Sequence, residues 1–187
     1  MTPIFDTKAP VTGAEIIGEL RRLHDEGDAY LRSLPADIFA RPQGEKWSPA
    51  DHVRHLAKSS RPVGMALGLP RFVLRLRFGR AKDPSRALSV LREAYLVRLA
   101  EGVTAGRFTP TPRAIPVDGA TDREKMLAEW NAADENLARR MAAWSEQDLD
   151  HYVLPHPALG RLTVREMLLF TLYHNSHHLN LVASRVP

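Results

Sequence analysis

The chain contains no cysteine. Disulfide bonds, thiolate metal ligands and a cysteine nucleophile are therefore excluded, and the expected compartment is the cytoplasm. Long apolar runs are also missing, since no stretch approaches the roughly 18–20 residues that cross a bilayer. The longest candidate, Met65 to Phe78, is interrupted by one proline and three arginines. Because the first residues lack the basic and apolar segments of a secretory signal, we expect neither secretion nor a membrane partner.

Charge of one sign is in only slight excess. The 187 residues include 26 Lys and Arg against 22 Asp and Glu, a formal net charge of +4. One segment concentrates the excess, and two phenylalanines are interleaved with its cations Arg71, Arg75, Arg77, Arg80 and Lys82. Such a local excess is more often a solvated or anion-binding surface than a nucleic-acid footprint. Since no nucleic-acid-binding motif and no Gly-rich phosphate loop accompany it, we expect no nucleic-acid partner.

Four helix starts divide the sequence. Capping boxes, in which a Thr hydroxyl and the Glu three residues later bond reciprocally to backbone N–H groups, begin at Thr12, Thr121 and Thr163. Ser48, followed by Pro49 and an acid in the first turn, is the fourth start. Apolar residues recur at steps of three and four after each start, which is typical of an amphipathic helix with one buried face. The alternation typical of strands is absent, so the expected fold is all-α, a four-helix bundle.

A long connection, at about residues 68–119, separates the second and third of these helices. It contains the basic segment and an expected fifth helix, for which Asp83 is the N-cap and which ends near Gly102. Successive prolines make 109–116 an irregular linker. We therefore expect a helical crossover insertion that moves the bundle away from simple up-down topology. Together with this insertion, residues 1–187 are expected to form a single domain.

A histidine pair carries the first functional signal. His174 and His178 are four residues apart in the last expected helix, so their side chains stand one above the other on one face. Both lie at the edge of its apolar stripe. Two imidazoles so placed can bind one divalent cation, with a third ligand supplied from elsewhere in the fold. The alternative is a pair of core histidines whose nitrogens are satisfied by side chains or water.

Two motifs resemble the signatures of the DinB-like (damage-inducible) superfamily. The first is Lys46-Trp-Ser-Pro-Ala-Asp-His-Val-Arg-His55-Leu-Ala, a Trp-Ser helix start followed by His-Leu. The second begins at Gly160 and ends in His174-Asn-Ser-His177-His178-Leu. Their order, their separation and their positions at the starts of the second and fourth helices also match. The resemblance covers most of the chain and is loose only in the 68–119 insertion.

This resemblance implies an up-down-down-up bundle, commonly a homodimer, that holds one divalent metal ion through three histidines. Carried onto this sequence, the ligands are His55, His174 and His178. Three neutral nitrogen ligands leave an open coordination position, which is the mark of a reactive metal site. Zn and Ni are the first candidates, followed by Fe, Co and Mn, since ligand type alone does not choose between them.

The family resemblance also indicates a chemistry. The family includes bacillithiol and mycothiol S-transferases and a mycothiol-dependent maleylpyruvate isomerase, which favours a metal-dependent enzyme that transfers a low-molecular-weight thiol to an electrophile. Because the chain has no cysteine, that thiol is a cosubstrate, and the segment Arg71–Lys82 is a candidate to hold its acidic groups. The alternatives are a metal-dependent hydrolase, a non-catalytic metal-binding stress-response protein and a purely structural helical dimer.

Asp134 is the only candidate for a catalytic base. It falls within the apolar stripe of the third helix, where an unpaired carboxylate is unfavourable and should meet a His N–H, an Arg or the metal region. Alternatively, the stripe rotates and Asp134 lies at its margin. Structural parts are favoured for the other histidines. His24 is expected in the core, and His151 and His156 in an irregular loop with Pro155 and Pro157. His177 is expected beside the metal ligands, at an interface or in solvent, and His52, three residues before His55, at the rim of the site or only at the helix start.

Overall fold

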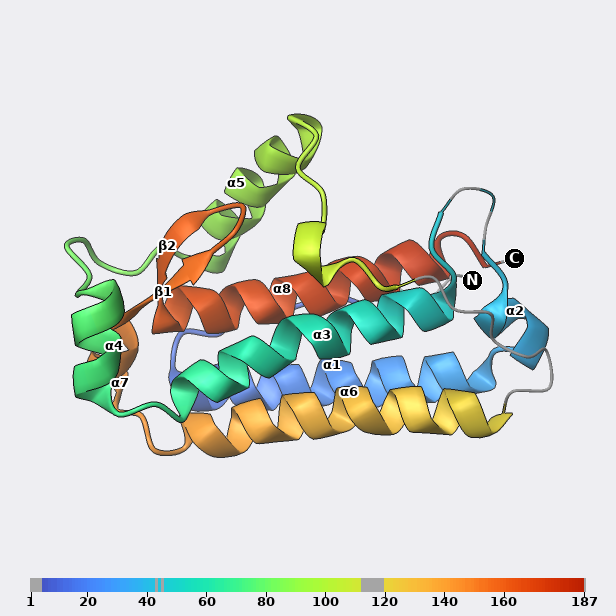
Figure 1. Ribbon diagram of the computed structural model, residues 1–187, viewed down its shortest axis with the longest axis horizontal. Helices are drawn as coiled ribbons and strands as arrows, with labels where there is room; N and C mark the ends of the chain where they lie inside the picture. The colour runs from blue at the N-terminus through green and yellow to red at the C-terminus, as the bar shows by residue number, and fades with distance from the viewer. Residues whose placement is uncertain (1–4, 43, 45, 112–119, 187) are drawn as a thin grey trace.

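Four long helices lie side by side along the length of the molecule (Figure 1). They are α1 (Gly13–Ser33), α3 (Pro49–Leu67), α6 (Ala120–Met141) and α8 (Val164–Ala183). In Figure 1, α1 and α8 run in one direction and α3 and α6 in the other, which confirms the up-down-down-up bundle. The computed structural model describes residues 5–42, 44, 46–111 and 120–186, and for 120 and 121 it describes the backbone only.

Local capping signals place three of the four helix starts. Thr12, Ser48 and Thr163 each accept a hydrogen bond from the backbone N–H three residues on, and the acid at that position bonds back to the cap residue. These reciprocal bonds satisfy donors that a helix start otherwise leaves free. The predicted box at Thr121 lies outside the described side chains, although α6 itself is present.

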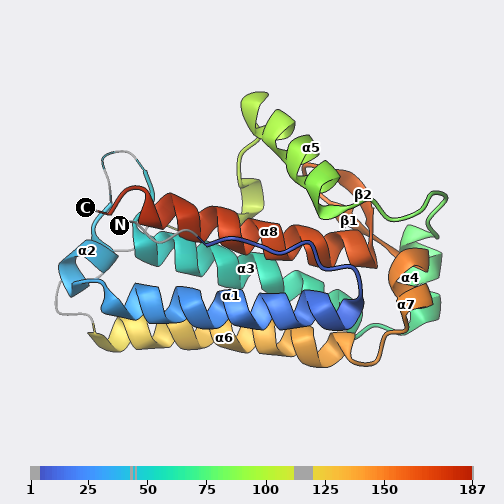
Figure 2. The ribbon, with the colours of Figure 1, turned by 180° about the vertical axis from the view of Figure 1, so that it is seen from behind.

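The central helix of the molecule is α8. It packs against α1 and α3 of the bundle and against α5 (Leu88–Ala100), which covers it from outside. The N-terminal segment runs back along α8 on the other side (Figure 2), where the Phe5 carbonyl accepts from Ser176 Oγ at 2.6 Å and from Asn180 Nδ2 at 2.7 Å. Polar side chains on α8 are therefore held inside the protein, including both members of the histidine pair.

Shorter elements connect the long helices. They are α2 (Ala36–Ala40), α4 (Arg71–Phe78), the 3-10 turn η1 (Gly106–Phe108) and α7 (Glu146–His151). The connection from α3 to α6 contains α4, α5 and η1. The predicted linker 109–116 falls mostly in residues 112–119, outside the described residues. Within the described part of the chain, no helix combines the length and apolar character needed to cross a lipid bilayer.

The start of α5 corrects a prediction. The helix begins at Leu88 with Ala87 as N-cap, and not at Asp83. The residues between them form tertiary hydrogen bonds instead: Ser85 Oγ donates to Asp150 Oδ1 at 2.6 Å, and Arg86 N donates to Glu166 Oε1 at 2.8 Å. Because these bonds tie residues 85 and 86 to α7 and to the start of α8, the helix does not begin at the local Asp-Pro signal.

A β-hairpin replaces the irregular loop expected before α8. Strands β1 (Val153–His156) and β2 (Gly160–Thr163) pair antiparallel, with Pro155 opposite Arg161. Proline is tolerated because each strand of a two-stranded sheet is an edge and has one side without ladder bonds. The turn is closed by His156, whose Nδ1 accepts from Ala158 N at 3.3 Å and Leu159 N at 3.0 Å.

Candidate metal centre

His55 from α3 meets His174 and His178 from α8. His174 Nε2 lies 3.1 Å from His55 Nε2 and 3.1 Å from His178 Nε2. One ligand atom from each residue lies within 4.8 Å of the other two, and all three side chains are buried. A single proton on His174 Nε2 can serve only one of these contacts, whereas one cation can accept a lone pair from all three nitrogens. The cluster could therefore hold a metal ion.

The hydrogen bonds around the cluster leave ring nitrogens with a free lone pair for a metal ion. His55 Nδ1 lies 3.0 Å from the Phe108 carbonyl of η1, and since a carbonyl only accepts, Nδ1 carries the ring proton. His55 Nε2 is then a bare lone pair that faces the other two rings. Nitrogens bound to a tetrahedral zinc at the usual bond length lie about 3.3 Å apart, close to the spacing of these atoms. The donor set thus fits a divalent transition metal.

His52 supports the cluster from the preceding turn of α3. Its Nδ1 lies 2.8 Å from His178 Nδ1, and the residue is only 4% exposed. If His178 ligates through Nε2, its Nδ1 carries the proton and donates to His52, which fixes the ring orientation as hydrogen-bonded partners of metal ligands do. The spacing of three residues from His55 indicates the rim of the site for His52, but the hydrogen bond to His178 could not be read from the sequence.

Burial keeps these histidines neutral. It is the largest cause that places the pKa of His174 and of His178 well below the ordinary value, and the charges of neighbouring histidines act in the same direction. Burial also lowers the pKa of His55, although its hydrogen bond to Phe108 acts against this. Neutral imidazole is the form that binds metal, so the free site does not need to lose protons near neutral pH.

A cavity of about 630 Å³ opens on one side of the cluster. All three histidines line it, together with His52 and His177, and its walls are mainly apolar side chains from α3, α5, α8 and the hairpin. Trp47 closes the cluster from one side, with its ring centroid 4.9 Å from that of His55 and its ring stacked on that of His178 at 6.0 Å. The space beside the histidines is large enough for an organic molecule.

His156 lies in a strand and not in the irregular loop that the sequence predicts. It lies in β1, lines the cavity, and its ring centroid is 4.3 Å from that of Phe170. Because its Nδ1 accepts two backbone N–H bonds, the proton of the neutral ring is on Nε2. His156 therefore presents a fixed donor at the cavity wall. The prolines around it hide this position in the sequence, since the hairpin that aims the ring forms only in the folded protein.

Asp134 lies elsewhere. Its Oδ2 is 3.1 Å from His24 Nδ1, which donates to it, and accepts from Asn175 Nδ2 at 3.3 Å. The predicted need of this carboxylate for a His N–H is thus met by His24 in the core, and Asp134 is not among the residues that line the cavity. The cations of the basic segment do not line the cavity either. Arg71, for example, donates to the Ala143 carbonyl and stacks on Trp144.

The metal-free protein should lose stability on mild acidification. Burial lowers the pKa of His52 to about 3 and that of His156 to about 4, from 6.5 for the exposed side chain. Their contribution is complete above pH 6.5 and is lost as the pH falls toward these values, because the unfolded chain binds the protons first. Each should cost about 2 kcal/mol of the free energy of unfolding between pH 7 and pH 5.

Urea unfolding of chelator-treated protein at both pH values measures this loss. His156→Gln, which cannot titrate, should show the smaller pH dependence. Equal free energies of unfolding at pH 7 and pH 5 for the unsubstituted protein would contradict the burial of neutral histidines.

Comparison with known proteins agrees with this geometry. The crystal structure of TT2238, described as a four-helix bundle protein, superposes with a TM-score of 0.56 at 18% sequence identity, over 92% of this chain and 99% of that one. At this identity the likeness establishes the fold. No curated protein matches. The sequence model of the DinB superfamily matches residues 34–182, which include all three histidines of the cluster. Because the match spans most of the length of this chain, the chain belongs to the DinB superfamily.

Proposed function

We propose that this protein is a metal-dependent S-transferase that joins a low-molecular-weight thiol to an electrophile. The observation that carries the proposal is the convergence of three neutral imidazole nitrogens at the wall of a cavity large enough for both reactants. In the reaction the thiol proton is released, a sulfur–carbon bond forms, and the leaving group departs with the electron pair of its bond to carbon. A divalent ion held by His55, His174 and His178 would supply a Lewis acid and would lower the pKa of a thiol.

The residues of the chain bind and orient the reactants. The Phe108 carbonyl and His52 hold the rings of His55 and His178, so the three nitrogens keep one face toward the cavity. The apolar walls exclude water, which strengthens electrostatic interactions inside the cavity. His156 Nε2–H is positioned to donate to an acceptor atom of a reactant.

Thiol transfer is favoured over hydrolysis by the composition of the cavity wall. Many hydrolases add to the metal ion a group that takes a proton from water, most often a histidine or a carboxylate. Among the described residues the lining contains no Asp or Glu, and Asp134 is hydrogen-bonded in the core instead. His52, His55, His174 and His178 lie within hydrogen-bond distance of one another, and His156 Nδ1 accepts from the hairpin backbone. His177 is then the one lining histidine for which no hydrogen bond is found within the described residues.

Adduct formation tests the proposal. Protein purified without a His tag is loaded with Zn or Ni and mixed with 1-chloro-2,4-dinitrobenzene and, in turn, bacillithiol, mycothiol and cysteine. We expect at least one thiol to be consumed about tenfold or more faster than with chelator-treated protein, and the rate to return when the metal is restored. A metal-loaded protein that accelerates none of these reactions would contradict the assignment, and release of the chloride without thiol would indicate a hydrolase.

A further inference from the structure

The described part of the cavity wall carries positive charge and contains no acidic residue. Lys46, Arg107 and Arg185 line it, and none of its described lining residues is Asp or Glu. Lys46 and Arg107 are exposed and Arg185 is half-buried, and no ion pair is found for any of the three within the described part of the chain. Cations gathered around an apolar cavity without counter-ions form a site of positive potential.

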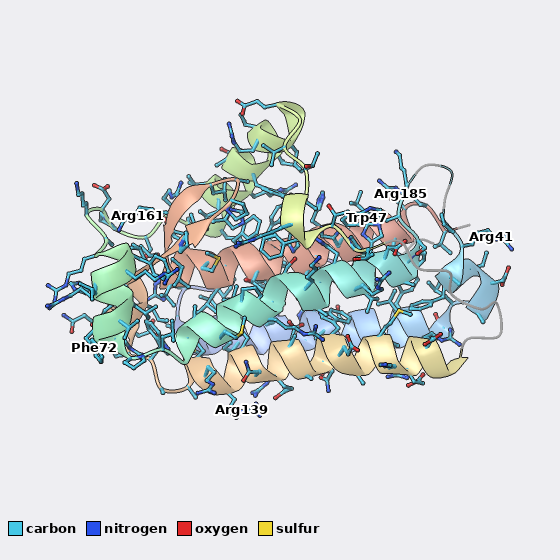
Figure 3. The ribbon with its side chains drawn as sticks, viewed as in Figure 1. Arg41, Trp47, Phe72, Arg139, Arg161 and Arg185 are labelled. Carbon is cyan, nitrogen blue, oxygen red and sulfur yellow. The ribbon has the colours of Figure 1, made fainter. Side chains whose placement is uncertain are left out.

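Arg185 and Arg107 can be placed relative to the histidine cluster. Arg185, half-buried after the end of α8, is close enough that its charge contributes to lowering the pKa of His52 and of His177. Figure 3 labels Arg185 and Trp47; both line the cavity, the Trp47 ring lies against His55, and Lys46 is the residue before that tryptophan. Arg107 stacks on Phe108, with its guanidinium carbon 5.0 Å from the ring centroid, and the Phe108 carbonyl bonds to His55.

An anion beside the histidines would also balance charge. Three neutral histidines leave the charge of a divalent ion uncompensated, and in an apolar cavity an uncompensated charge is unfavourable. Metal sites in proteins usually contain or adjoin a carboxylate, but this lining provides none among its described residues. One thiolate would offset part of this charge, and three cations at the rim would still lack a partner.

Much of the remaining lining is apolar, as at Val63, Leu99, Leu154 and Met167. A reactant that fits both the cations and these walls has an aliphatic or aromatic body and an acidic head. Apolar walls bind the body by excluding water, while the cations select the head.

We infer that the cavity binds an apolar organic acid, with its carboxylate held by Lys46, Arg107 and Arg185. That this acid is the electrophile rests on the proposed function, whereas the binding preference does not. The carboxylate would then be fixed beside the three nitrogens, and the reactive carbon of the acid would lie next to the thiol. Arg107 and Arg185, which can form paired hydrogen bonds to a carboxylate, are the principal specificity residues.

Calorimetric titration with a matched pair of probes tests the inference. 4-Phenylbutyrate and 4-phenylbutyramide have the same apolar body and differ in the charge of the head. We expect the acid to bind metal-loaded protein about tenfold or more tightly than the amide, and the combined substitution Arg107→Gln and Arg185→Gln to remove that difference. Amide binding should change little, which shows that the variant still folds.

Arg75→Gln is the matched control, because Arg75 is exposed on α4 and does not line the cavity. The same titrations with chelator-treated protein separate the cations from the metal: the preference for the acid should persist there, although weaker. Equal affinity for acid and amide, or an equal loss in the Arg75→Gln protein, would overturn the inference. If the protein prefers the acid over the amide but consumes no thiol, the proposed function is contradicted and the inferred binding site is not.

Discussion

His174→Ala is expected to abolish stable metal binding. Its Nε2 is the central atom of the cluster, 3.1 Å from each of the other two ligand nitrogens, so the two imidazoles that remain come from different helices and share no third donor. Loss even of a residue that only orients a metal ligand lowers affinity by about 10–100-fold, and loss of a ligand should exceed that range. Elemental analysis should find close to one divalent ion per chain in the unsubstituted protein and almost none in the variant.

Two neighbouring histidines provide the controls for this substitution. His177→Ala removes an adjacent, half-buried ring of the same cavity that is not one of the three converging residues, so metal content should be kept. His52→Ala removes only the partner of His178 Nδ1 and should give an intermediate loss of affinity, measured by competition with a chromogenic chelator. Equal metal content in the unsubstituted protein and His174→Ala, with unchanged circular dichroism, would rule out the three-histidine centre.

The helices were predictable because their signals are local. A capping box involves residues three apart in sequence, and its bonds form as soon as the first turn does. The inner faces follow for the same reason: Leu23, Leu56 and Trp130 occupy apolar positions at helical spacing, and each is at most 1% exposed. His174 and His178 were visible because four residues on a helix bring two rings together, whereas His55 came from the family resemblance.

The features that the sequence did not predict depend on contacts between segments that are far apart in the chain. His52 became part of the centre only because α8 brings His178 Nδ1 to 2.8 Å, a contact across 126 positions of the chain. His156 is aimed by a hairpin whose short strands contain a proline and show no clear alternation. The start of α5 differs from the predicted one because Ser85 and Arg86 form hydrogen bonds with residues at the start of α8. Local propensity is a weak prior at such positions, and tertiary bonds decide them.

Glu166→Ala should cause the largest loss of stability among the polar substitutions proposed for this protein. Its carboxylate accepts from Arg86 N at 2.8 Å, Arg86 Nε at 2.7 Å, Arg86 Nη2 at 3.1 Å and Thr163 N at 3.0 Å. Burial acts to raise the pKa of Glu166, but these bonds lower it overall, so the group is a carboxylate at neutral pH. It joins the connection before α5 to the start of the helix that carries His174 and His178.

Removal of a buried ion-pair partner leaves the other charge and its donors unsatisfied, which destabilises proteins by about 3–5 kcal/mol. Since the Arg86 side chain is 38% exposed and can recover water, we expect a loss near the lower end, about 3 kcal/mol in the free energy of urea unfolding. Glu15→Ala is the matched control, because Glu15 closes the same capping box on α1 without an ion pair and is fully exposed. Its loss should be much smaller, and equal losses would mean that Glu166 acts only as a helix cap and does not anchor the connection to α8.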